Sequence, residues 1–114
     1  MKKILPILLL ILATNVAMAQ DNEALKKHYL KIYDQGLAYN DVSASINALH
    51  GYLAIDNSLN YKDTLSMLYF SVKNYYSALL LGEEVYKAQP ENVSAMARSA
   101  ECYDELGDPK TAVT

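Results

Sequence analysis

Few side chains in this sequence have the types and spacing that catalysis or metal binding requires. His28 and His50 are the only histidines, and no cysteine or acidic cluster accompanies either at the spacing of a zinc site. No Ser-His-Asp or Cys-His arrangement is readable from the order of residues, although such a triad need not be local in sequence. We expect both histidines to be exposed or half-buried residues of helices. We also predict that the chain is not an enzyme and holds no metal or cofactor.

Two adjacent acidic pairs, Glu83-Glu84 and Asp104-Glu105, could be read as paired carboxylates for acid–base chemistry. Successive residues of a helix point about 100° apart, so neither pair converges on one point. We interpret both pairs as solvated helix surface. The four glycines stand singly, so the chain has no glycine-rich phosphate loop. Cys102 is the only cysteine and has apolar neighbours, which is typical of a small core residue rather than a nucleophile.

The first 19 residues have the layout of a secretory signal peptide. Lys2 and Lys3 supply a positive start, an apolar run follows, and small residues end the segment at Ala17-Met18-Ala19. A membrane-spanning helix needs about 20 apolar residues, and this run is shorter. We expect cleavage near Ala19, which leaves a mature domain over residues 20–114.

The mature chain predicted in this way is acidic. Loss of Lys2 and Lys3 leaves eight basic side chains against 13 acidic ones, a formal charge of −5. Nucleic acids and anionic membranes bind basic surfaces, so neither is an expected partner. Cys102 lies far from the cleavage point, where a bacterial lipoprotein carries its lipid. We predict a bacterial exported protein, periplasmic or extracellular, whose mature chain does not insert into a membrane.

Almost every segment after residue 20 has the apolar spacing of a helix. Intervals of three and four connect Leu65, Leu68, Tyr69 and Val72, and no window alternates as a strand would. Short breakers separate the periodic runs, and they are Asn40-Asp41, Asp56-Asn57-Ser58, Lys73-Asn74, Gln89-Pro90-Glu91-Asn92 and Gly107-Asp108-Pro109. We therefore expect about six helices of roughly 12 to 16 residues, joined by turns so short that neighbours are antiparallel.

Several breakers contain residues that start or stop a helix. Asn74, Asn92 and Asp108 have side chains that accept hydrogen bonds from the free amides of a following helix. Pro109 suits the first helical position, and Gly107 suits a left-handed helix ending.

A repeat of 34 residues runs through the second half of the chain. Three features recur at this distance, and they are Tyr69 with Tyr103, Ala78 with Ala112, and the turn Lys73-Asn74 with the turn Gly107-Asp108. An earlier unit aligns at an offset nearer 33, which places Asn40-Asp41 on Lys73-Asn74. The units are about 24–58, 59–92 and 93–114, and the last is incomplete.

This pattern resembles the tetratricopeptide repeat family, whose unit is 34 residues folded as two antiparallel helices. The residue types that the family prefers stand at Leu65, Tyr69, Tyr75, Ala78 and Pro90, and again at Ala100, Tyr103, Gly107 and Ala112. The chain departs from the family in having no tryptophan, Ser99 in place of leucine, and Gly82 in place of a large ring. The resemblance implies an all-α fold of antiparallel hairpins stacked as a right-handed solenoid. In such a solenoid, Ala78 and Ala112 would let the two helices of a hairpin approach closely, and Tyr69 and Tyr103 would fill the gaps between units.

The resemblance also implies where a partner binds. In this family one side of the first helix of each hairpin lines a concave groove. Here that side carries Asn60, Asp63, Met67 and Phe70, and in the next unit Ser94, Ala97, Glu101 and Asp104. An aromatic ring and a methionine beside acidic residues suit a basic, apolar peptide. The alternative is that Met67 and Phe70 pack against the neighbouring hairpin.

One subtype of the family clamps a peptide carboxylate with lysines and asparagines. The corresponding positions here are Asp63, Met67 and Ala97, and only Arg98 is compatible with such a clamp. We therefore do not expect carboxylate binding.

The predicted function is a protein-interaction scaffold of the cell envelope that holds a protein or peptide partner in this groove. Two alternatives stay open: the helical front of a longer envelope enzyme or nutrient-uptake protein, and a structural protein that associates with itself. Because the last helix stops about six residues in, we expect the natural protein to continue past Thr114.

Overall fold

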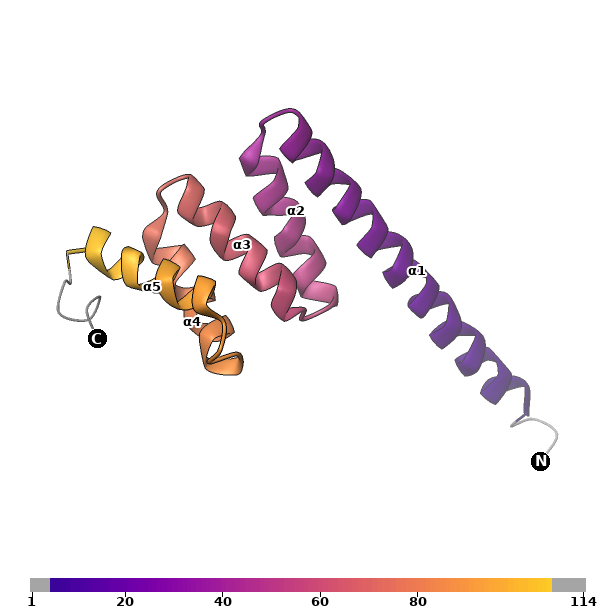
Figure 1. The fold of residues 1–114 in the computed structure, drawn as a ribbon. Coiled ribbons are helices and arrows are strands. Elements are labelled where there is room, and N and C mark those ends of the chain that lie inside the picture. The colour runs from indigo at the N-terminus through magenta and orange to yellow at the C-terminus, as the bar shows by residue number, and fades with distance from the viewer. Residues whose placement is uncertain (1–4, 108–114) are drawn as a thin grey trace.

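The computed structural model describes residues 5–107, with side chains from residue 21 onward, and its regular structure is entirely helical. The five helices are α1 (Leu5–Ala38), α2 (Val42–Ile55), α3 (Leu59–Ser71), α4 (Tyr75–Ala88) and α5 (Val93–Glu105) (Figure 1). No strand occurs within 5–107, so the all-α prediction is confirmed. The predicted sixth helix, with Asp108, Pro109 and Ala112, falls outside the described residues.

Each helix packs against the next one along the chain, and α3 also packs against α5 (Figure 1). The connections have only three or four residues, which forces neighbouring helices to run antiparallel. In the corresponding earlier pair, the backbones of α1 and α3 do not come close within the described residues, although Tyr33 of α1 packs against the cluster that contains Leu65 of α3. Among the described residues, close backbone approach between alternate helices is therefore found for α3 and α5, where the sequence repeat is also clearest.

Helix α1 is much longer than its neighbours. Its 34 residues extend about 51 Å, whereas the 14 residues of α2 cover about 21 Å. Figure 1 shows the first half of α1 extending away from the other helices. Residues 5–19 of the predicted signal peptide lie in this extension, and the half of α1 that packs against α2 follows them.

Every helix after α1 begins with a capping side chain. The bonds join Asp41 to the amide of Ala44, Ser58 to that of Tyr61, Asn74 to that of Ser77, and Asn92 to that of Ala95. The predicted caps Asn74 and Asn92 are confirmed. Asp41 and Ser58 were expected only as parts of turns, and the structure shows that they cap as well.

The turns that follow α1, α3 and α5 share one backbone geometry. Each contains a left-handed residue, with φ of 58° at Asn40, 65° at Lys73 and 85° at Gly107. The amide of the next residue returns to the helix, from Asp41 to the Gly36 carbonyl at 2.7 Å and from Asn74 to the Tyr69 carbonyl at 2.9 Å. The left-handed residues stand 33 and 34 positions apart, so the backbone repeats with the interval read from the sequence.

Serine hydroxyls also repeat between paired helices. Ser45 Oγ donates to the carbonyl of Tyr33 at 2.8 Å, which joins α2 to α1. Ser66 Oγ donates to the carbonyl of Ala78 at 2.7 Å, which joins α3 to α4. Both bonds span 12 residues and lie 33 positions apart, but the donor is on the second helix in one pair and on the first in the other. Each hydroxyl donates to a carbonyl of the paired helix, so its hydrogen-bonding need is met, and the bond holds the two backbones close together.

Two clusters of buried residues form much of the core, and Tyr69 packs against both. The first cluster contains Ile46, Leu49 and Leu65, and the second contains Ala78, Leu79 and Cys102. Tyr69 packs against both, and its hydroxyl lies 2.6 Å from Nε2 of His50 on α2. This side chain therefore links α2 and α3 to the helices that follow, as expected for a residue between units.

Gly82 occupies a crowded point of the second half. A Cβ atom there would lie 2.9 Å from Ser99 Oγ and 3.3 Å from Ser66 Oγ. Because α3, α4 and α5 approach so closely at this point, the large ring that the family prefers has no room.

Candidate partner-binding groove

A hollow of about 330 Å³ lies between α3 and α5. Its lining consists of Met67, Phe70, Ser94, Ala97, Arg98 and Glu101. Met67 and Glu101 occupy equivalent positions 34 residues apart, so the two helices present the same side to this space. Four of the predicted groove residues, and Ser94 from the equivalent stripe, are therefore brought together.

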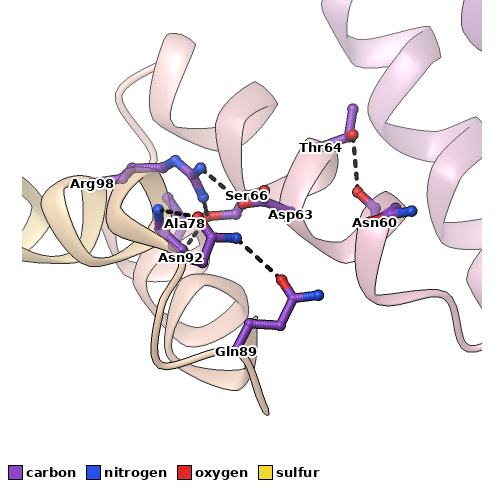
Figure 2. Close-up of polar contacts among 9 residues, drawn as sticks. Asn60, Asp63, Thr64, Ser66, Ala78, Gln89, Asn92 and Arg98 are labelled. Atoms are coloured by element: carbon purple, nitrogen blue, oxygen red, sulfur yellow. Dashed lines mark hydrogen bonds and ion pairs between the residues drawn. The ribbon is translucent and has the colours of Figure 1, made fainter. Parts of the chain in front are cut away.

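The other three predicted groove residues do not line the hollow. Asp63 binds Arg98, with 2.8 Å between its Oδ1 and the guanidinium Nη2 (Figure 2). Asn60 is exposed, and its carbonyl accepts a bond from Thr64 Oγ1 at 3.0 Å (Figure 2). Asp104 is exposed at the far end of α5. The hollow therefore occupies the middle of the predicted stripe and leaves out its ends.

Arg98 is the site residue that the sequence pattern did not single out as part of the groove. It is only 8% exposed, and its Nη1 donates to Ser66 Oγ at 2.9 Å while Nη2 pairs with Asp63 (Figure 2). A buried guanidinium requires such partners, because an unpaired charge in this position would be very costly. The signal in the sequence is its place between Ala95 and Cys102, at the spacing of the buried face of α5.

Met67 and Phe70 behave differently from each other. Met67 is 51% exposed, whereas Phe70 is half-buried and meets the ring of Tyr75 edge-on, with 5.6 Å between ring centroids. Phe70 also packs against the second core cluster. The two interpretations of these residues are therefore compatible, because Phe70 packs on the neighbouring helix and still forms one wall of the hollow.

The available charge at the hollow is acidic. Asp63 already neutralises Arg98. Glu101 is exposed and makes no ion pair among the described side chains. Desolvation, followed by the negative charge of Glu105, raises the pKa of Tyr75, and Glu101 acts in the same direction.

The other residues considered for chemistry have structural surroundings. His28 and His50 are both exposed, as predicted. The adjacent acids diverge, because Glu83 accepts a bond from the Tyr103 hydroxyl while Glu84 pairs with Lys62 at 2.9 Å.

Cys102 is fully buried in the second core cluster, as expected of a small core residue. Within the described residues, no three histidine, cysteine or acidic side chains are placed to hold a metal ion. In the same part of the chain, no helix is both long and apolar enough to cross a bilayer.

Comparison with known proteins assigns no relative, because neither a family model nor a curated protein matches this chain. The resemblance to tetratricopeptide repeats therefore depends on the residue pattern described above.

Proposed function

We propose that this chain is a tetratricopeptide-like interaction module that acts by binding and not by catalysis, holding a partner protein or peptide between α3 and α5. The observation that supports this most is the hollow itself. It is lined by Met67 and Phe70 from one helix and by Ala97 and Glu101 from the other, so that an apolar wall faces solvent. Half-exposed apolar side chains gathered in a depression are typical of a site for another molecule.

A right-handed stack of hairpins is the arrangement we propose for the helices. The common backbone geometry of the turns at Asn40, Lys73 and Gly107 supports it, as does the packing of α3 against α5. In such a stack each hairpin buries its apolar face only against its neighbours, and the first helices of successive hairpins together line one surface.

We further propose that the protein works outside the cytoplasm of a bacterium. The support is the order of charges, apolar run and small residues at the start of the chain. Fractionation of cells that express the full chain, with mass spectrometry of its N-terminus, tests this. A periplasmic or secreted product that begins near Gln20 is expected, and an uncleaved cytoplasmic product would contradict the assignment.

Site-specific photo-crosslinking in living cells tests the binding function. A photoreactive phenylalanine derivative would replace Ala97, which lines the hollow, and in a control chain Leu80, which is 52% exposed on α4. We expect a discrete partner to crosslink from position 97 and not from position 80, and to disappear when Met67→Asp is added.

Two other outcomes are equally informative. Crosslinks to the same proteins from both positions would contradict a specific groove and indicate nonspecific adhesion. A second copy of the chain as the sole crosslinked species would instead favour the self-associating alternative.

A further inference from the structure

The charge arrangement at the hollow indicates which chemistry a partner must have, and this inference rests on the proposed function. Arg98 lines the hollow, but its cation is committed to Asp63 at 2.8 Å and to Ser66 at 2.9 Å. The Arg98 side chain is 7% exposed and that of Asp63 is 25% exposed. An anionic ligand would have to compete with Asp63 for a guanidinium whose hydrogen bonds are already made. We therefore expect anions to bind weakly in the hollow.

Glu101 provides the opposite charge in an accessible form. It lines the hollow from α5, it is exposed, and no basic side chain in the described region pairs with it. The basic groups of α3 and its turn are Lys62, which pairs with Glu84 at 2.9 Å, and Lys73, which is exposed in the turn after the helix. A cation brought by a partner therefore finds an unoccupied carboxylate here.

The remaining lining residues are apolar except for Ser94. Met67, Phe70 and Ala97 form a wall whose methionine adapts its shape to different side chains. A volume of about 330 Å³ lies at the small end of binding pockets, so it accommodates one or two side chains rather than a folded surface.

We propose that the hollow takes a short partner segment in which an apolar side chain, held against Met67 and Phe70, stands beside a lysine or arginine that pairs with Glu101. Selectivity against acidic segments follows from the same geometry. The Arg98–Asp63 pair keeps the only lining cation unavailable, while Glu101 repels a second carboxylate.

Three matched peptides test this with the full chain. Each carries a leucine flanked by lysines, by glutamines or by glutamates, and fluorescence anisotropy of the labelled peptide gives its affinity. In the unaltered chain, the methyl resonance of Met67 also reports occupation of the hollow. We expect the lysine peptide to bind most tightly and the glutamate peptide least tightly, with a difference that shrinks at high salt. In Glu101→Gln the lysine peptide should lose about three- to fivefold in affinity and the glutamine peptide should be unchanged, as for an exposed ion pair.

Two control variants separate the charge from the groove. Glu91→Gln removes an exposed carboxylate of the α4–α5 connection and should leave all three affinities unchanged. Met67→Ser removes apolar wall without adding charge and should weaken all three peptides together.

Each outcome decides one of the two proposals. If Met67→Ser weakens binding but the three peptides bind alike, the groove stands and the inference about charge is overturned. A lysine peptide that binds no more tightly than the glutamine peptide, including no measurable binding, also overturns it. The proposed function is then decided separately by crosslinking from position 97.

Discussion

At the scale of single residues, two serines at the contact of α3, α4 and α5 have different roles. Ser66 donates to the carbonyl of Ala78 and accepts a bond from Arg98, so its hydroxyl completes a buried polar network. Ser99 lies at the same crowded point opposite Gly82, and its buried hydroxyl has no hydrogen-bond partner. Burial of an unsatisfied hydroxyl is unfavourable, whereas loss of a satisfied one leaves its partners unpaired.

The same substitution should therefore have opposite effects at these two serines. Ser99→Ala is expected to raise the free energy of unfolding by about 1 kcal/mol, because it removes the unsatisfied group. Ser66→Ala is expected to lower it by about 1–3 kcal/mol, because Arg98 loses an acceptor. Urea denaturation of both variants measures the difference, and a destabilised Ser99→Ala would show that its hydroxyl has a partner after all.

Cys102 gives a prediction that depends on pH. Desolvation raises the pKa of this thiol above its ordinary value of 9.0, so the native chain holds less thiolate than the unfolded chain at any given pH. The unfolded chain loses its proton first, and this group's contribution to stability is therefore full below pH 9 and lost at higher pH.

Alkylation of the Cys102 thiol at pH 8 should be slow in the native protein and fast in denaturant. The control is Ser94→Cys in a Cys102→Ala background, where an exposed thiol lining the hollow should react quickly without denaturant. Equal native rates at the two positions would mean that the second core cluster opens readily.

At the scale of helices and turns, the three left-handed turn residues differ in how well they tolerate their conformation. Gly107 adopts φ of 85° without cost, and asparagine tolerates the left-handed region at Asn40. Lys73 has neither advantage at φ of 65°. The turn between α3 and α4 is therefore the most strained of the three.

Lys73→Gly should raise the free energy of unfolding by about 0.5–1 kcal/mol, because the left-handed strain outweighs the entropy that glycine adds to the unfolded chain. Asn40→Gly, at the equivalent turn between α1 and α2, should change the free energy of unfolding by less. Thermal melting of the two variants compares them directly. A larger gain from Asn40→Gly would show that strain in these turns does not follow residue type.

At the scale of the whole molecule, we expect Tyr69 to couple the unfolding of the two core clusters. Its ring packs against both clusters, and its hydroxyl contacts His50 on α2. If the helices stack as proposed, each hairpin contacts only its neighbours, so cooperativity depends on the residues at such junctions.

Tyr69→Ala should lower stability by about 2–4 kcal/mol and make the unfolding transition broader, because the half-buried ring fills the junction. Hydrogen exchange should then show the amides around Ile46 and Leu49 opening at a different free energy from those around Leu79 and Cys102. Tyr86→Ala is the control, since Tyr86 is 37% exposed and belongs to neither cluster. A single sharp transition in Tyr69→Ala would assign the coupling to other contacts.

Local chemistry explains why much of this fold was predictable from the sequence. The helices, their breaks and the caps at Asn74 and Asn92 depend on side chains that act within a few residues of their own position. The left-handed ending at Gly107 depends on the missing Cβ of one residue. The 34-residue interval needed only a comparison of the chain with itself.

Contacts between distant residues were decided by the tertiary structure alone. The pairing of Arg98 with Asp63 across 35 positions committed the one cation that the sequence left available, and so made the hollow acidic. The close approach at Gly82 excluded a large ring there. Packing also determined that Met67 faces solvent while the ring of Phe70 contacts that of Tyr75. Sequence periodicity predicts on which side of a helix a residue lies, but not which residues of other helices it will contact.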